Sequence, residues 1–208
     1  MTSKSRASKT PAKKSGSNAQ YNKKSNAGKK QKTLDELLED NLKDIYSAEV
    51  QLLEALPEMA DAAQNEDLQD AFTNHYEQTL KQVSRLEKIF DRFDIDISEV
   101  EPCEAMAGLI AEGKKIIEEY EESPVRDSAL IIGSQKIEHY EIASYGSLCE
   151  LADVLGYSNL HDLLGRSLDE EENTDELLTE IASDINDEAK EMSDAHNESY
   201  SEEMENVR

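Results

Sequence analysis

The chain has 208 residues, of which 37% are hydrophobic, and its formal net charge is −25. This length allows one domain of ordinary size. The sequence contains no long apolar run, and no apolar segment follows its basic N-terminus. We therefore expect neither a membrane span nor a signal peptide, and the cytoplasm is the default location.

The charge is divided unevenly along the chain. Residues 1–32 carry ten Lys and Arg residues and no Asp or Glu, whereas the rest carries 12 basic against 47 acidic residues, or −35. Repulsion among so many acids destabilises a folded protein at low ionic strength, where screening is weak. The acidity therefore predicts a halophilic, salt-adapted protein.

Residues 1–32 show no apolar periodicity, so we expect a disordered basic arm. Such an arm can contact nucleic-acid phosphates without sequence preference. Alternatively, it is a solvated tail or folds back on the acidic remainder of the chain. The domain itself is expected to span residues 33–190, followed by an acidic polar tail over 191–208.

The first two helices of this domain are predicted from a capping box at Thr33 and Glu36 and from apolar seams at helical spacing. In the first seam the polar exception is Glu49, at the midpoint. A turn at Gln64 leads to the second helix, whose seam is polar only in its middle, at His75, Thr79 and Gln82. A connection this short makes the two helices antiparallel, so their polar midpoints lie at similar depth.

The second half of the domain repeats this arrangement. After a loop and a shorter helix that begins near Cys103, Ser123 and Pro124 are expected to start a long helix that ends at Gly156. Its seam is apolar at both ends and acidic in the middle, at Glu138 and Glu141. The fourth long helix starts at Ser158, has an acidic midpoint at Glu171 and Asp175, and is expected to fray beyond Lys190.

These midpoints converge if the four helices form one antiparallel bundle. Two carboxylates 4 Å apart repel by about 4 kcal/mol at an effective dielectric constant near 20, and burial also removes their hydration. Acids with one imidazole suit divalent iron or manganese, and two such ions would neutralise most of the charge. The sequence therefore predicts two metal ions among Glu49, His75, Glu138, Glu141, Glu171 and Asp175.

Each of these residues also has an ordinary interpretation. Glu49 alone could pair with a Lys or Arg, His75 alone could be a hydrogen-bonded core histidine, and Glu171 with Asp175 could line a solvated face. Taken together they favour a metal site, because no seam position near a midpoint carries Lys or Arg. His139 lies about 100° around the helix from Glu138, so we expect it at the surface.

Four segments are similar to the YciE/YciF family of ferritin-like proteins: residues 44–52 (DIYSAEVQL), 126–131 (RDSALI), 138–146 (EHYEIASYG) and 168–171 (LDEE). The resemblance implies an all-α, ferritin-like antiparallel four-helix bundle with one additional shorter helix in the crossover. It also implies a homodimer, a two-metal centre and an association with stress responses. The ligands that it implies are Glu49, His75, Glu138, Glu141 and Glu171, with Asp175 next.

The chain departs from broader ferritin-like enzymes, which carry Glu-x-x-His on the second and fourth helices. Here Glu77 follows His75 and points away from the seam, and the fourth helix offers Glu171 and Asp175 instead. Our leading hypothesis is a metal-binding protein that acts on oxygen or peroxide under stress. The alternative is a non-catalytic stress or interaction protein with a structural metal site and an arm that contacts nucleic acid.

Overall fold

The computed structural model describes residues 31–206, with side chains through residue 197. This part of the chain contains no strand and is built from α-helices with a single 3-10 turn at Ile97–Glu99. The helices are α1 (Leu34–Ala62), α2 (Glu66–Phe93), α3 (Glu104–Glu119), α4 (Pro124–Val154) and α5 (Ser158–Asn206). The predicted arm over 1–32 lies almost entirely outside the described residues, so its disorder and its nucleic-acid contact stay predictions.

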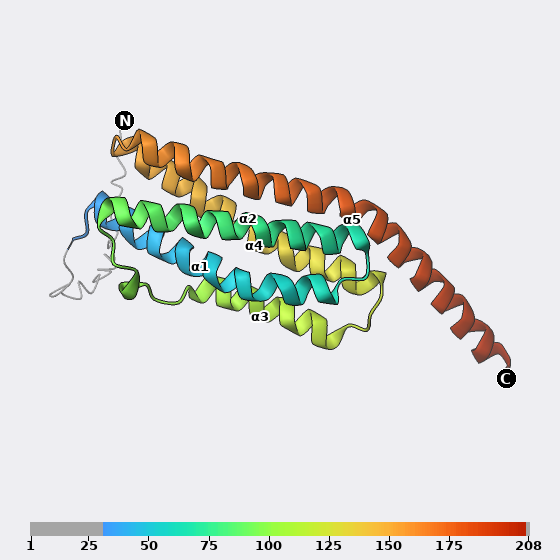
Figure 1. Cartoon of the computed structure of the whole chain (residues 1–208). Coiled ribbons are helices and arrows are strands. Elements are labelled where there is room, and N and C mark those ends of the chain that lie inside the picture. Colours follow the sequence, from blue (N-terminus) through green and yellow to red (C-terminus); the bar gives the residue numbers. More distant parts are fainter. Residues whose placement is uncertain (1–30, 207–208) are drawn as a thin grey trace, which may run out of the picture. The chain divides into compact units, whose positions relative to one another are not determined.

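Four long helices form the bundle, and α3 is the added shorter helix of the crossover (Figure 1). Helix α1 packs on α2 and α4, and α5 packs on α2 and α4, so the four helices close a ring in which neighbours run antiparallel. Helix α3 lies against α1 and α4. This is a ferritin-like arrangement with one long crossover, and it confirms the predicted fold class.

Local sequence signals place the helix ends as expected. In the capping box, the Glu36 N–H donates to Thr33 Oγ1 over 3.2 Å and the Thr33 N–H donates to Glu36 Oε2 over 2.8 Å. Ser123 caps α4 with proline at its first turn. Gly156 has φ 78°, a left-handed conformation that glycine adopts without strain, and it follows α4 as predicted.

One contact that fixes the bundle was not predicted. The buried carboxylate of Asp127, in the first turn of α4, accepts hydrogen bonds from the backbone N–H groups of Gln64 (3.0 Å) and Asn65 (2.8 Å). Gln64 and Asn65 belong to the turn between α1 and α2. The α1–α2 pair is thereby tied to the start of α4, which helps to set the relative depth of the helices.

Helix α5 is longer than expected, because it continues past Lys190 as far as Asn206. Residues 166–208 contain no Gly or Pro, so nothing in this sequence stops a helix. An ion pair of 3.3 Å between Lys190 and Asp194, one turn apart, supports the extension. The helix therefore runs past the position near Lys190 where the sequence predicted fraying, and residues 191–197 are exposed.

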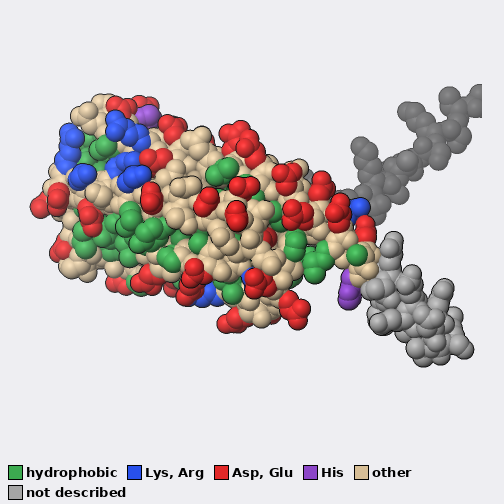
Figure 2. Space-filling model, turned by 45° about the vertical axis from the view of Figure 1, so that its right-hand side comes forward, with side chains coloured by type: hydrophobic (Ala, Val, Ile, Leu, Met, Phe, Trp, Pro, Cys, Tyr) green, Lys and Arg blue, Asp and Glu red, His purple; other side chains and the backbone are tan. Residues whose placement is uncertain are grey.

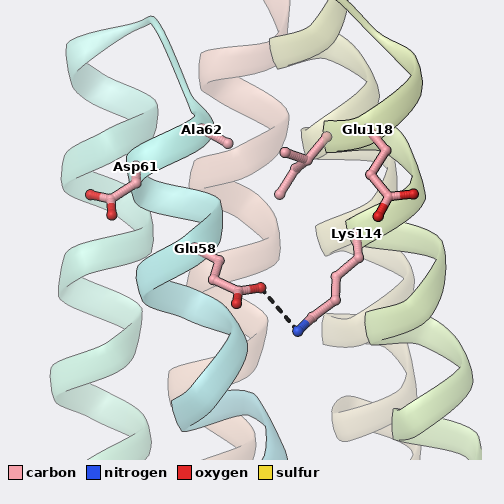
Figure 3. A pocket seen from close by; sticks show the side chains of 6 residues that line it. Glu58, Asp61, Ala62, Lys114 and Glu118 are labelled. Carbon is pink, nitrogen blue, oxygen red and sulfur yellow. Dashed lines mark ion pairs between the residues drawn. The ribbon is translucent and has the colours of Figure 1, made fainter.

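The surface is strongly acidic. Asp and Glu side chains cover much of the face shown in Figure 2, and Lys and Arg side chains gather at one end of it. A surface pocket of about 500 Å³ lies between α1 and α3, where Glu58 and Lys114 form an ion pair of 3.0 Å (Figure 3). None of the six predicted metal ligands lines this pocket. No helix among the described residues has the length and apolar character needed to cross a membrane.

Candidate metal centre

The polar midpoints of the four long helices meet inside the bundle. Glu49 of α1, Glu138 and Glu141 of α4, and Glu171 of α5 are each 0% exposed, and His75 of α2 is 1% exposed. Glu138 and Glu141 are three residues apart, so both carboxylates leave α4 on the same face. The antiparallel pairing of the helices brings the midpoints to the same level, as the sequence predicted.

The imidazole of His75 lies between two carboxylates. Its Nδ1 is 3.3 Å from Glu138 Oε1, and its Nε2 is 3.2 Å from Glu171 Oε2. His75, Glu138, Glu141 and Glu171 each offer one ligand atom, and these four atoms lie within 4.8 Å of one another. This buried group can hold a metal ion.

The polar atoms of the cluster are poorly satisfied by the protein itself. Buried atoms with no hydrogen-bond partner among the described residues include Glu49 Oε2, Glu138 Oε2, both carboxylate oxygens of Glu141 and Asp175 Oδ1. The ring nitrogens of His75 and Glu171 Oε2 also make no hydrogen bond, and the ring contacts Glu138 and Glu171 only as ion pairs of 3.3 and 3.2 Å. A buried carboxylate oxygen without a partner loses its hydration and gains nothing in return. Unpartnered oxygens around one imidazole therefore fit a divalent cation, which would supply the missing interactions.

Neutral side chains donate to three of the acids. The Tyr145 hydroxyl donates to Glu49 Oε1, and the Gln82 amide donates to Glu171 Oε1. Ser134 Oγ donates to Glu138 Oε1 over a longer 3.4 Å. Tyr145 lies four residues after Glu141 on the seam of α4, and its role was not predicted; tyrosine at a seam position is also common in an ordinary core.

A second row of polar contacts lies beside the cluster. The Gln82 amide also donates to Glu170 Oε2 over 3.1 Å, and both oxygens of Glu170 accept from the Arg85 guanidinium over 3.0 Å. Glu170 neighbours Glu171 in sequence and had no predicted role. Its partner lies on another helix, so the α5 sequence gave no signal for this contact.

Burial and mutual repulsion raise the pKa values of the acids. Burial raises the pKa of Glu138 to about 8. The pKa values of Glu49 and Glu141 are held well above the usual range by burial and by neighbouring carboxylates. Burial lowers the pKa of His75, but the charges of Glu138 and Glu171 outweigh it and raise that pKa to about 9. Without a cation, the cluster therefore retains protons at neutral pH.

Asp175 occupies the edge of the cluster. Its side chain is 24% exposed, and its Oδ2 lies 3.2 Å from Nε2 of His139, whose side chain is 69% exposed. The exposed position predicted for His139 is confirmed, although its contact with Asp175 was not foreseen. Glu49 is outside the group of four close ligand atoms, but its charge acts on His75. The assignment of all six residues as ligands stays a prediction.

Comparisons with known proteins agree with this architecture. Residues 33–191 match the family described as "Domain of unknown function (DUF892)". The chain is 45% identical over 152 residues to Protein YciF of Escherichia coli (strain K12), covering 73% of this chain and 91% of that protein.

Solved structures show the same fold. The E. coli stress protein YciF superposes with a TM-score of 0.72 at 43% identity, covering 76% of this chain and 99% of that one. YcfI of Rhodopseudomonas palustris, described as a candidate structural protein, superposes with a TM-score of 0.68 at 36% identity. The match covers 73% of this chain and 96% of that one. The chain therefore belongs to the YciF-type family of helical proteins described as a domain of unknown function (DUF892).

Proposed function

We propose that the protein binds two divalent metal ions, iron or manganese, between Glu49, His75, Glu138, Glu141, Glu171 and Asp175, and that it acts on oxygen or peroxide under stress. The observation that carries this proposal is the set of buried carboxylate oxygens without hydrogen-bond partners around one imidazole. Keeping such atoms together in a bundle interior costs free energy unless protons or a cation compensate them.

The charge and the ligand types of the cluster support two divalent iron or manganese ions. Five carboxylates and one imidazole face one region of the bundle, and two divalent ions would balance most of that charge. Among the described residues, no Lys or Arg forms an ion pair with any of the six; in the metal-free protein these carboxylates form ion pairs only with imidazoles, those of His75 and His139. Glu138, together with Glu49 or Glu171, would be among the residues that hold the ions.

The surrounding residues would prepare the centre for redox chemistry. Tyr145 and Gln82 hold Glu49 and Glu171 in place through one carboxylate oxygen each, leaving Glu49 Oε2 and Glu171 Oε2 without hydrogen-bond partners and available as ligands. Apolar side chains such as Leu52 and Leu148, both 0% exposed, exclude water around the cluster. Bound iron or manganese would supply the electrons for reducing oxygen or peroxide. The stress role is inferred from the similar E. coli protein, which is described as a stress protein.

Metal analysis of the purified chain tests this proposal. We expect about two iron or manganese ions per chain after anaerobic loading and desalting, and a large loss in Glu138→Gln, which keeps the shape of the side chain but not its charge. The matched control is Glu150→Gln, an exposed glutamate on the same helix. Equal metal content in all three proteins would contradict the proposal.

A second function keeps the metal site but assigns it a structural role. It is favoured by the single imidazole in the cluster, and by the similar protein YcfI, described as a candidate structural protein. Oxygen consumption after addition of ferrous iron separates the two functions. If metal raises the melting temperature but no oxygen is consumed, the structural role is the correct one.

A further inference from the structure

We infer that His139 and Asp175 form an access site, between α4 and α5, through which cations reach the buried cluster. The inference rests on the proposed metal binding and names the route that serves it. Glu49, His75, Glu138, Glu141 and Glu171 are at most 1% exposed, so an ion cannot meet them directly from solvent. A route must therefore begin at a residue that reaches both the surface and the cluster.

Asp175 is such a residue. Its Oδ1 is buried and has no hydrogen-bond partner, whereas Oδ2 faces the exposed ring of His139. The charge of Asp175 also adds to the burial that raises the pKa of Glu138, which places the two carboxylates within electrostatic reach. Asp175 thus connects a surface imidazole to the innermost acids of α4.

The contact geometry suits a cation held by two groups. Metal bonds to imidazole nitrogen and carboxylate oxygen are about 2.0–2.2 Å long, so two ligand atoms on one ion lie about 3 Å apart. His139 Nε2 and Asp175 Oδ2 are 3.2 Å apart. The ring nitrogen and the carboxylate oxygen can therefore share one ion without moving far.

Glu170 is also a partly exposed acid beside the cluster, but both of its oxygens already accept hydrogen bonds from Arg85. Glu170 accepts two hydrogen bonds of 3.0 Å from Arg85, and Arg85 also donates to Ser167 over 2.5 Å. A guanidinium remains charged at every physiological pH, so it competes permanently with any incoming metal ion. Asp175 pairs with His139 and, among the described residues, with no Lys or Arg, so no guanidinium competes for an ion on its side.

The test follows the rate of metal uptake separately from the amount bound. Full-length metal-free protein is mixed with Mn²⁺, and free Mn²⁺ is followed by electron paramagnetic resonance. We expect His139→Ala to load several-fold more slowly than wild type but to reach the same final Mn²⁺ content. The matched control is His161→Ala, an exposed histidine that also lies beside an aspartate, Asp162, at 3.6 Å, and it should load like wild type.

Each other outcome is decisive. If wild type takes up neither Mn²⁺ nor, under anaerobic conditions, Fe²⁺, both the proposed function and the access site fail. If His139→Ala loads as fast as wild type to the same content, the access site is wrong while the metal centre stands. If its final Mn²⁺ content falls, His139 is a ligand of the resident centre and the assignment of an access role is overturned.

Discussion

Glu141 shows most directly how the cluster opposes folding when no cation is bound. Both of its carboxylate oxygens are buried without a hydrogen-bond partner. Burial, followed by the charge of Glu49, holds its pKa well above the usual range. We predict that Glu141→Gln raises the free energy of unfolding of the metal-free protein at pH 8 by about 1–3 kcal/mol, because a buried acid is removed.

The same substitution should reduce the stabilisation gained on adding Mn²⁺, because a ligand is lost. Urea unfolding with a chelator and with saturating Mn²⁺ measures both effects. Glu150→Gln on the exposed side of α4 should change the free energy of unfolding by less than about 0.5 kcal/mol in either condition. A metal-free Glu141→Gln protein that is less stable than wild type would show that this carboxylate has a partner in the protein.

The pH dependence of the metal-free protein follows from Glu138 and His75. Folding raises the pKa of Glu138 from 4.5 to about 8 and that of His75 from 6.5 to about 9. The folded state therefore binds protons more tightly, and this stabilisation is complete below the ordinary pKa values and lost as pH rises through the raised ones. We predict that the free energy of unfolding of the metal-free protein falls between about pH 5 and pH 9.

Thermal unfolding with a chelator across this pH range measures how steeply the stability of the metal-free protein falls with pH. Glu138→Gln should flatten this slope, and Glu150→Gln should not. With saturating Mn²⁺ the slope should reverse or disappear, since metal binding displaces the protons. A metal-free wild-type protein that gains stability as pH rises toward 9 would contradict the raised pKa values.

At the scale of helices, the seams of the sequence predicted the bundle and the level at which Glu49, His75, Glu138, Glu141 and Glu171 meet. This worked because a residue's position on a helix face depends only on local spacing. Contacts between helices were harder to predict. Arg85 reaches Glu170 and His139 reaches Asp175 across helix pairs, and neither contact has a periodic pattern in the sequence.

Asp127 is the clearest case of an unpredicted contact between elements. Its buried carboxylate accepts hydrogen bonds from two backbone N–H groups of the α1–α2 turn. Hydrogen bonds to a charged acceptor contribute about 1.5–3 kcal/mol, and losing the acceptor leaves buried donors unpaired. We predict that Asp127→Ala lowers the free energy of unfolding by about 2–4 kcal/mol.

Chemical denaturation measures this change, with Asp153→Ala, an exposed aspartate near the other end of α4, as the control. Because Asp127 also sets the depth of α4 relative to α1 and α2, we expect a weaker gain in stability on adding Mn²⁺. If Asp127→Ala unfolds like wild type, the turn is held by other contacts.

At the scale of the whole molecule, the homodimer implied by the family resemblance stays a prediction. Tyr46 of α1 donates to Glu87 of α2 over 3.5 Å on the outer side of this helix pair. Val50 (39% exposed) lies one turn after Tyr46 in α1, and Leu80 (45% exposed) lies two turns before Glu87 in α2. We predict that two copies pack through this α1–α2 face, because exposed apolar side chains there would be buried.

Light scattering with size-exclusion chromatography tests the dimer. The double variant Val50→Glu and Leu80→Glu should be monomeric, because it places charges inside the interface. The control is Ile132→Glu, a 58% exposed residue of α4. A double variant that remains dimeric would place the interface elsewhere.

The charge distribution of the whole molecule controls how its thermal stability depends on salt. The chain after residue 32 carries −35, and acidic side chains are spread over the face in Figure 2 and outnumber the basic ones. The Debye length falls from about 10 Å at 0.1 M to about 3 Å at 1 M salt, so KCl should relieve repulsion across the helical surfaces. We predict a melting temperature that rises with KCl, by about 2–4 °C for each kcal/mol gained in a chain of this size.

The matched control is sucrose, which stabilises compact states by exclusion from the protein surface but screens no charge. Screening predicts a steep rise below about 0.5 M KCl that levels off as the Debye length becomes shorter than the spacing between surface acids. Deleting residues 1–32 should steepen this rise, because the deletion removes the ten basic charges that partly balance the acids. If the melting temperature responds to sucrose but not to KCl, acidity does not make this protein dependent on salt.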